Sequence, residues 1–304
     1  MKTSRRQFLQ TASLGLGSLG LLSTSAISAE PKAKAKAPRA ATPGFAQKSK
    51  MRLGIVTYNI ALDWDVPTII KNCTEAKIEG VELRTSHKHG VEVTLDKAQR
   101  AEVKKRFADS PVVLASMGSA FDYHTPDQAK LRKDIEATKE YIVLAHDVGA
   151  SGVKVRPNGL PKEVPVEKTL EQIGRSLREL GEFAAGYGQQ IRLEVHGNPT
   201  SQVPYNKTIM DVANHPQVGV CWNSNQTDLE GAGFEANFAM LKNKIFTVHM
   251  RDLYLEEYPF RKLLTSLNAS GFTGFCFAEI QESKDPVRVL KYFRALWLAY
   301  QGLL

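Results

Sequence analysis

The sequence predicts a single parallel (β/α)8 barrel, and three of its features support that fold class. From Arg52 onward, short runs rich in β-branched residues alternate with longer amphipathic runs, as in a parallel sheet with crossover helices. The alternation repeats eight times, and eight repeats over about 250 residues match the strand count and size of a TIM barrel. Charged side chains line one face of at least four strands, as expected of a closed barrel with a polar mouth.

The strands are expected, in order, at Leu53–Tyr58, Gly80–Arg84, Val112–Met117, Gly152–Arg156, Ile191–His196, Val218–Asn223, Ile245–Arg251 and Gly274–Glu279. The helices are expected at Val66–Ala76, Leu95–Ala108, Asp127–Val148, Glu167–Tyr187, Asn206–Ala213, Phe234–Leu241, Phe260–Ala269 and Asp285–Tyr300. A doubly wound open sheet is the alternative, and it usually carries a glycine-rich phosphate loop after its first strand. No such loop follows Gly54-Ile55-Val56, which favours the barrel.

The N-terminal residues have the features of an export signal. Ser4-Arg5-Arg6-Gln7-Phe8-Leu9 has the twin-arginine pattern, and a Gly- and Leu-rich stretch from Thr11 to Ile27 follows it. Small residues around Ala26 and Ala29 suit a cleavage site. Glycines and serines break the stretch, which falls short of about 20 strongly apolar residues, so a retained membrane anchor is the less favoured alternative.

This signal defines the expected domain organisation. Residues 1–29 form a twin-arginine signal peptide, residues 30–50 a disordered tether rich in Lys, Ala and Pro, and residues 51–304 the barrel. We expect the mature protein in the periplasm or another extracytoplasmic space, without a membrane attachment after cleavage. The oligomeric state stays open, and a homo-oligomer is one alternative.

The net charge of the chain resides in its N-terminal part. The formal charge is +8, and residues 1–50 contain nine Lys and Arg residues against one Glu, a difference of eight. The barrel is therefore near neutral, which argues against nucleic-acid binding. Cys73, Cys221 and Cys276 are scattered and odd in number, so we expect neither a disulfide framework nor a cysteine metal site.

Strand residues two apart share a face, and the two faces differ sharply. One face is charged or polar, with Glu82/Arg84, Lys154/Arg156, Arg192/Glu194/His196 and Thr247/His249/Arg251. The other is apolar, with Val81/Leu83, Val153/Val155, Ile191/Leu193/Val195 and Val248/Met250. Buried charges cost several kcal/mol each unless they pair, bind a metal or face water, so the charged face is expected inside the barrel, towards its mouth.

Four polar residues end consecutive predicted strands: Glu194, Asn223, His249 and Glu279. Two carboxylates, an imidazole and an amide oxygen at one mouth suit a divalent cation such as Mn²⁺, Mg²⁺ or Zn²⁺. The alternative is a set of ion pairs, with Glu194 held by Arg156 and His249 as a neutral core histidine. The coincidence of all four at equivalent strand ends favours the metal site.

These segments resemble the xylose isomerase-like TIM barrel family, also called sugar phosphate isomerases/epimerases. The resemblance covers residues 51–304 and rests on Gly80-Val81-Glu82-Leu83-Arg84, His87, His89-Gly90-Val91-Glu92, Leu193-Glu194-Val195-His196, His249-Met250-Arg251-Asp252 and Glu279. It implies one metal bound by Glu, Asp, His and Glu from the last four strands. Glu194, His249 and Glu279 match that set, whereas Asn223 replaces the Asp and implies loosely held metal. Gln226 stands where ketose epimerases have a sugar-binding His, which speaks against close ketose-epimerase specificity.

The resemblance also implies a reaction. The metal would polarise a substrate carbonyl, while Glu194 and Glu279 remove and return a proton on carbon through an enediolate. The remaining polar and aromatic residues near the mouth are candidates for binding a small sugar or sugar-derived substrate: His196, Arg156, Arg251, His87, His89, Trp222 and Glu82. Trp222 either caps the core or stacks on substrate. For Lys154 and Arg192 we prefer internal ion pairing with Glu82, Glu194 or Asp252.

The function expected first is therefore a metal-dependent isomerase or epimerase of a sugar, and export argues against a phosphorylated substrate. A keto-sugar lyase or hydrolase could use the same proton abstraction. A catalytically silent sugar-binding barrel is a third reading, which Asn223 supports. The DNA-repair endonuclease type of this family ranks last, because the fourth strand ends in Val155-Arg156 rather than in a carboxylate.

Overall fold

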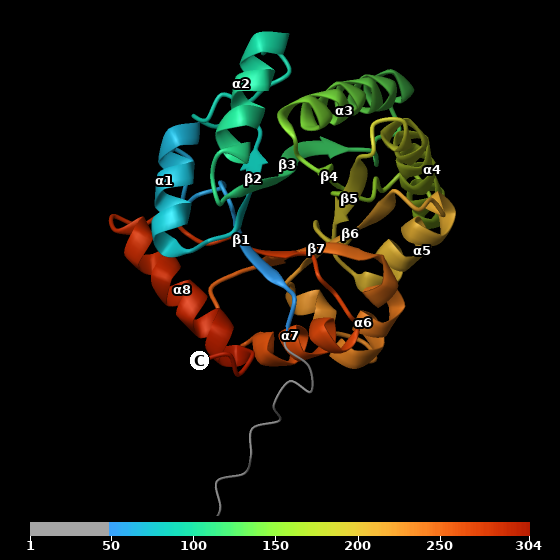
Figure 1. Cartoon of the computed structure of the whole chain (residues 1–304). Helices are drawn as coiled ribbons and strands as arrows, with labels where there is room; N and C mark the ends of the chain where they lie inside the picture. The colour runs from blue at the N-terminus through green and yellow to red at the C-terminus, as the bar shows by residue number, and fades with distance from the viewer. Residues whose placement is uncertain (1–48) are drawn as a thin grey trace, which may run out of the picture. The chain divides into compact units, whose positions relative to one another are not determined.

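The computed structural model describes residues 49–304. Within them, eight parallel strands form a closed barrel in the order β1 to β8, and β8 pairs with β1. The helices surround the strands as an outer ring (Figure 1). The predicted (β/α)8 fold is confirmed, whereas the predicted signal peptide and most of the predicted tether, residues 30–50, lie outside the described residues.

The strands are β1 (Arg52–Val56), β2 (Gly80–Arg84), β3 (Val113–Asp122), β4 (Gly152–Arg156), β5 (Gln190–Glu194), β6 (Val218–Asn223), β7 (Ile245–Met250) and β8 (Phe275–Ala278). The helices are α1 (Val66–Ala76), α2 (Lys97–Ala108), α3 (Gln128–Val148), α4 (Val166–Ala185), α5 (Val203–Ala213), α6 (Phe234–Leu241), α7 (Phe260–Ala269) and α8 (Pro286–Tyr300). Two short 3₁₀ helices, η1 (Gln226–Leu229) and η2 (Lys242–Lys244), follow β6 and α6 among the described residues.

Some helices and strands begin or end at other residues than predicted, because local hydrogen bonds or turns determine their ends. Helix α2 begins at Lys97 rather than Leu95, because the Asp96 carboxylate accepts from the Gln99 backbone N–H and the Gln99 side chain caps Asp96 in return. Strand β5 ends at Glu194, two residues before the predicted end, because the chain turns at Gly197 with φ +90°. His196 therefore lies in the loop after β5.

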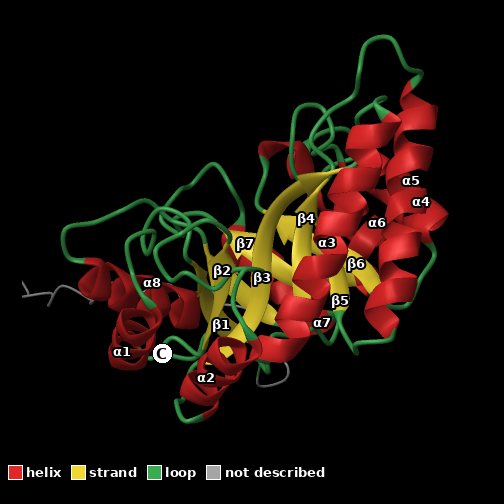
Figure 2. Ribbon diagram, turned by 90° about the horizontal axis from the view of Figure 1, so that it is seen from above, coloured by secondary structure: helices red, strands yellow, loops and turns green. Residues whose placement is uncertain are grey.

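The two faces of the strands separate as expected. Apolar strand side chains such as Val81, Leu193 and Val248 have no exposed surface and pack in the core between strands and helices. In the polar set, Glu82, Lys154, Glu194 and His249 are buried and contact one another inside the barrel. The loops at the carboxyl ends of the strands gather at one end of the barrel (Figure 2). The barrel therefore concentrates its polar side chains below one rim of loops.

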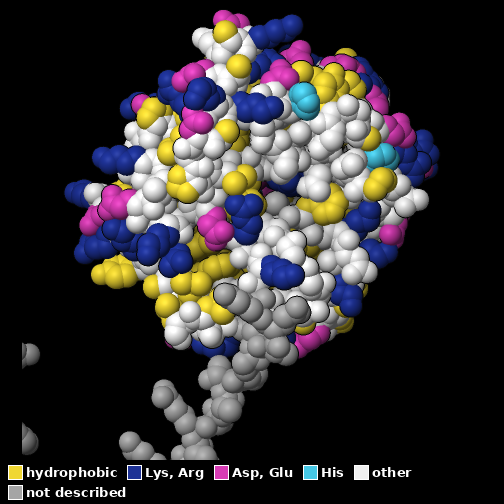
Figure 3. All heavy atoms as spheres, viewed as in Figure 1, with side chains coloured by type: hydrophobic (Ala, Val, Ile, Leu, Met, Phe, Trp, Pro, Cys, Tyr) yellow, Lys and Arg dark blue, Asp and Glu magenta, His cyan; other side chains and the backbone are white. Residues whose placement is uncertain are grey.

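The three cysteines of the chain, Cys73, Cys221 and Cys276, are buried free thiols. None of the helices in the described part of the chain is long and apolar enough to span a bilayer. Basic and acidic side chains are intermixed on the face drawn in Figure 3.

A buried carboxyl group supports β6 from outside the barrel. Oδ2 of Asp228 accepts hydrogen bonds from the Tyr258 hydroxyl at 2.6 Å and the Asn225 backbone N–H at 3.1 Å. The same hydroxyl accepts a hydrogen bond from Nε1 of Trp222 at 3.0 Å. Burial raises the pKa of Asp228 to about 8, so the folded protein holds a proton there that the unfolded chain releases near pH 4.

This carboxyl should make the folded state less stable as pH rises from about 4 to about 8, because only the unfolded chain ionises it in that window. The full effect is on the order of 5 kcal/mol, since each pKa unit corresponds to about 1.4 kcal/mol. Urea unfolding of wild type and Asp228→Asn at pH 5 and pH 8 measures it, and the variant should lose much less stability at pH 8. Asp63→Asn, an exposed loop position, is the control and should behave as wild type. Identical pH dependence of Asp228→Asn and wild type would show that Asp228 ionises normally.

Candidate functional site

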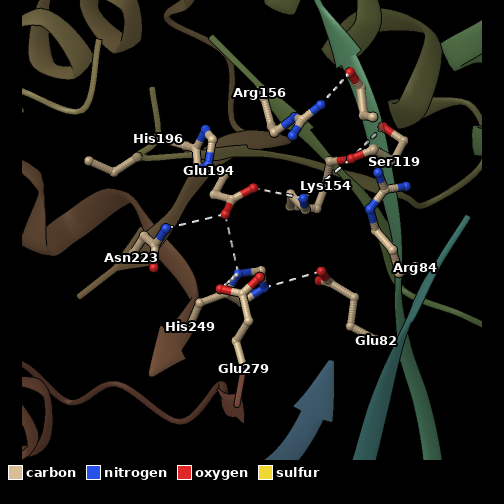
Figure 4. A network of polar contacts seen from close by, with 12 residues as sticks. Glu82, Arg84, Ser119, Lys154, Arg156, Glu194, His196, Asn223, His249 and Glu279 are labelled. Carbon is tan, nitrogen blue, oxygen red and sulfur yellow. Dashed lines mark hydrogen bonds and ion pairs between the residues drawn. The ribbon is translucent and has the colours of Figure 1, made fainter. Parts of the chain in front are cut away.

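The candidate site lies inside the barrel, at the carboxyl ends of its strands. The side chains come from β2, β4, β5, β6 and β7 and from the residue that follows β8 (Figure 4). They are Glu82, Lys154, Glu194, Asn223, His249 and Glu279. All but Glu279 are buried, and the Glu279 side chain keeps 22% of its surface exposed. Glu279 is therefore the most accessible member of the set.

Glu194, His249 and Glu279 form a cluster with the dimensions of a metal site. One ligand atom from each lies within 4.8 Å of the other two. Nδ1 of His249 is 3.5 Å from Oε1 of Glu194 and 3.6 Å from Oε2 of Glu279. This nitrogen is buried and has no hydrogen-bond partner in residues 49–304. A buried imidazole nitrogen aimed between two carboxylates fits a divalent cation, so the residues present suit the metal that the sequence predicts.

Glu82 holds the other side of the His249 ring. Its Oε1 lies 3.1 Å from Nε2 of His249, and both side chains have no exposed surface. Because an ionised carboxylate only accepts hydrogen bonds, Nε2 carries the proton and donates it. Ligating histidines commonly have such a carboxylate partner, which fixes the tautomer and the ring orientation. Glu82, predicted as a substrate ligand, thus lies beneath the imidazole.

Lys154 is the ion-pair partner of Glu194. Its Nζ lies 2.7 Å from Oε2 of Glu194, with both side chains almost fully buried, and donates to the Ser119 carbonyl at 3.3 Å. The internal pairing preferred for Lys154 is therefore observed. Arg156, the partner considered from the sequence, instead donates from Nη2 to the Ala120 carbonyl at 3.3 Å.

Asn223 contacts the second oxygen of the same carboxylate. Its Nδ2 donates to Oε1 of Glu194 at 3.3 Å, and the residue is 8% exposed. Oε2 of Glu194 thus faces Lys154, whereas Oε1 faces Asn223 and His249. Only Oε1 points towards the candidate metal position, so Glu194 is arranged as a monodentate ligand.

The charges in the site stabilise one another. Burial alone would raise the pKa of Glu194, but the Lys154 ammonium and the His249 ring hold it well below its usual range. Burial would likewise lower the pKa of His249, but Cys221 beside the ring and the Glu82 carboxylate bring it well above its usual range. Glu194 is therefore ionised at neutral pH, as a metal ligand and a proton acceptor must be, whereas the His249 ring must release a proton from Nδ1 when a metal binds.

A chain of hydrogen bonds orients His196 at the rim of the site. Nδ2 of Asn158 donates to Oδ2 of Asp122 at 3.0 Å, which turns Oδ1 of Asn158 towards Nδ1 of His196 at 3.1 Å. Nδ1 is then the donor in this contact, which leaves Nε2 for another partner. The other oxygen of Asp122 lies 3.1 Å from Nδ1 of His124. Sequence reasoning missed Asn158 and Asp122, because β3 extends five residues beyond its predicted end.

The other predicted substrate residues are spread around the rim or lie away from it. Nδ1 of His87 is 3.2 Å from the Thr57 hydroxyl, and Nε2 of His89 is 2.8 Å from the Arg84 carbonyl. Nε of Arg251 donates to the Ser224 carbonyl at 3.0 Å.

Two further residues singled out from the sequence, Trp222 and Arg192, lie away from the candidate metal site. Trp222 is fully buried on the helix side of β6, with its ring against Phe238, which is the core position considered from the sequence. Arg192 forms no ion pair with Glu82, Glu194 or Asp252 in residues 49–304. It bonds instead to neutral groups near the start of β5, because its side chain lies one layer below the site.

Solved structures with the same fold include sugar epimerases. The 3-keto-D-glucoside 4-epimerase from E. coli superposes with a TM-score of 0.68 at 14% identity, covering 82% of this chain and 99% of that chain. D-Psicose 3-epimerase from Clostridium cellulolyticum H10, solved with D-tagatose, gives 0.71 at 12% identity, covering 83% and 99%. The IOLI protein, solved with a zinc atom, gives 0.67 at 18% identity, covering 82% and 99%. At these identities the likeness establishes the fold.

The sequence itself identifies the family. No curated protein is detectably similar in sequence. Residues 70–296, most of the barrel, match the family described as xylose isomerase-like TIM barrel. The expected resemblance is confirmed, and the chain belongs to the xylose isomerase-like TIM barrel family.

Proposed function

We propose that this protein is a divalent-metal-dependent sugar isomerase or epimerase that moves a proton on the carbon next to a carbonyl. One observation carries the proposal: two carboxylates converge on a buried imidazole nitrogen that has no hydrogen-bond partner in the described part of the chain. Structures of the same fold include epimerases of keto-sugars and a zinc-bound protein, which supports the reaction class and the metal.

The metal would be held by Glu194, Nδ1 of His249 and Glu279, with Oδ1 of Asn223 as a fourth, neutral ligand once the amide turns away from the contact that its Nδ2 makes with Glu194. When bound, such a cation polarises a substrate carbonyl and stabilises the negative charge that develops on its oxygen. The neutral amide makes the ligand set less anionic than one with Asp at this position, so we expect weak metal binding. Glu82 contributes by presenting the correct nitrogen of His249.

The protein's own groups handle the proton. Glu279 is the more exposed carboxylate and is placed to exchange a proton with the substrate, while Glu194 is kept ionised by Lys154 and serves as the second acid–base group. His196 lies next to Glu194 in the loop after β5, and Arg156 ends the neighbouring strand β4 (Figure 4). Their donors and acceptors are suited to binding sugar hydroxyls.

A catalytically silent sugar-binding barrel is the second candidate, and the Lys154–Glu194 pair favours it. An ammonium already neutralises one of the carboxylates, and Asn223 adds no charge. A barrel with this arrangement could bind a sugar through its rim without loading metal. The two functions differ in metal binding and in proton exchange, and the following experiments separate them.

Changing Asn223 to Asp should tighten metal binding. An added anion at ~4 Å from a cation is worth roughly 4 kcal/mol per unit charge at an effective dielectric of about 20, and desolvation and repulsion from Glu194 offset most of it. We expect a net gain of about 1–3 kcal/mol, or roughly 5- to 150-fold. Calorimetric titration of Mn²⁺ or Zn²⁺ into metal-free wild type and Asn223→Asp measures the difference.

Asn214→Asp makes the same charge change at an exposed position after α5 and should leave the affinity unchanged. Unchanged or weaker binding by Asn223→Asp would mean that residue 223 does not face the metal. If neither wild type nor Asn223→Asp binds a metal, the result would favour the second candidate function, a sugar-binding barrel without catalytic activity.

Glu279→Gln should abolish proton exchange with little effect on stability. Loss of an acid–base group typically costs 10²- to 10⁴-fold in rate, and a partly exposed side chain should change unfolding by only about 1 kcal/mol. The assay is ¹H NMR in D₂O with a panel of unphosphorylated ketoses and keto-sugars, following loss of the C–H signal next to the carbonyl. Bound sugar without exchange in wild type would contradict the enzymatic proposal.

Glu194→Gln should lose exchange and also destabilise the metal-free protein by about 3–5 kcal/mol, because it leaves the Lys154 ammonium buried without its carboxylate. The double variant Lys154→Met, Glu194→Gln should recover most of the stability and none of the exchange. If Glu194→Gln is no less stable than wild type, the ion pair contributes nothing to the fold.

A further inference from the structure

A cavity lies at the opposite end of the barrel from the candidate metal site. Its volume is about 590 Å³, and it is lined by the first residues of several strands, among them Arg52 of β1, Gln190 of β5, Ile245 of β7 and Phe275 of β8. TIM-barrel active sites lie at the carboxyl ends of the strands, whereas this cavity lies at the amino ends. It is therefore separate from the site described above.

A buried guanidinium without an anion forms part of the wall. Arg192 is 4% exposed, and its hydrogen bonds go to neutral acceptors: the Ala115 carbonyl at 3.1 Å, the Ser151 hydroxyl at 2.7 Å and Oε1 of Gln190 at 2.9 Å. Within residues 49–304 no carboxylate lies within ion-pair distance of it. A buried charge that lacks a counter-charge is costly, so this position favours an anion from outside the barrel.

A second buried polar group in the wall lacks a partner. Thr247 is 2% exposed, and its hydroxyl oxygen makes no hydrogen bond within the described residues. It lines the same cavity as Arg192. Buried hydroxyls are nearly always hydrogen-bonded, so this one is available to a ligand.

The rest of the lining combines positive charge with aromatic surface. Arg52 and Lys242 add two cations, and none of the lining residues is acidic. The Arg52 guanidinium lies 4.2 Å from the centre of the Phe275 ring, and Glu79, outside the lining, is its partner at 3.6 Å. Phe246 also lines the cavity. The cavity thus offers cations and a buried hydroxyl beside flat apolar walls.

We propose that this cavity is a second ligand site and that it binds an organic anion, an acidic group carried on a flat apolar body. The acidic group, a carboxylate or a phosphate, is placed against Arg192 and Thr247, and the body against Phe246 and Phe275. The volume lies in the range of small-molecule sites, about 300–1,000 Å³. This proposal does not depend on the function proposed for the candidate metal site at the carboxyl ends of the strands.

The test titrates benzoate and phenyl phosphate into the purified full-length protein by calorimetry, with inorganic phosphate and benzyl alcohol as probes that lack the body or the charge. We expect one equivalent of benzoate or phenyl phosphate to bind. The ligand that binds more tightly shows whether the site prefers a carboxylate or a phosphate. Inorganic phosphate binding as tightly as phenyl phosphate, or benzyl alcohol as tightly as benzoate, would overturn the proposal. So would the absence of binding by both aromatic anions.

Two variants locate the site. Lys242→Glu at the exposed rim and Thr247→Val in the wall should each weaken binding by about tenfold or more, whereas Lys133→Glu, the same charge change on α3, should not. Thr247→Val removes a hydroxyl without a partner, so the ligand-free variant should be at least as stable as wild type, which thermal unfolding verifies. Binding that survives both variants unchanged lies elsewhere and contradicts the assignment.

Discussion

The ion pair between Lys154 and Glu194 is the interaction on which the interior of this barrel depends. A closed parallel barrel excludes water from the inner faces of its strands, yet β2, β4, β5 and β7 each place a charged or ionisable side chain there. Such charges are costly unless a counter-charge or several hydrogen-bond acceptors or donors compensate them. The 2.7 Å contact between β4 and β5 meets that requirement and keeps Glu194 ionised in a position that burial alone would neutralise.

The same pair shapes the chemistry of the site. By engaging Oε2 of Glu194, Lys154 leaves only Oε1 to face Asn223, His249 and Glu279. Glu82 acts in parallel on the other side, since its hydrogen bond to Nε2 turns Nδ1 of His249 towards the carboxylates. Lys154 and Glu82 need not touch the substrate, yet they determine which atoms of Glu194 and His249 are available to a metal. Arg192 lies one layer lower in the barrel and has no counter-charge within the described residues. The amino end of the barrel therefore differs from the carboxyl end, where the buried charges are paired.

Much of the candidate site could be predicted because strand ends in a parallel barrel meet at one mouth. Glu194, His249 and Glu279 were predicted together on that ground, and their ligand atoms do lie within 4.8 Å of one another. The partner of Glu194 could not be predicted in the same way. Lys154 and Arg156 share a face of β4 and differ only in depth, and strand alternation does not indicate which cation reaches the carboxylate. The orienting role of Asn158 was missed because it depends on a loop after β4 meeting the extended end of β3.

The sequence by itself determined the barrel, the face of each strand that turns inward, and the family to which the chain belongs. These follow from alternation along the chain and from short motifs, which are local properties that survive without knowledge of the packing. Only the tertiary structure decided which buried charges are paired, which nitrogen of His249 faces the carboxylates, and that a cation-lined cavity lies at the amino ends of the strands. Those features depend on distances between residues far apart in the chain, such as the 167 positions between Glu82 and His249, and ångström differences in such distances decide whether a charge is compensated.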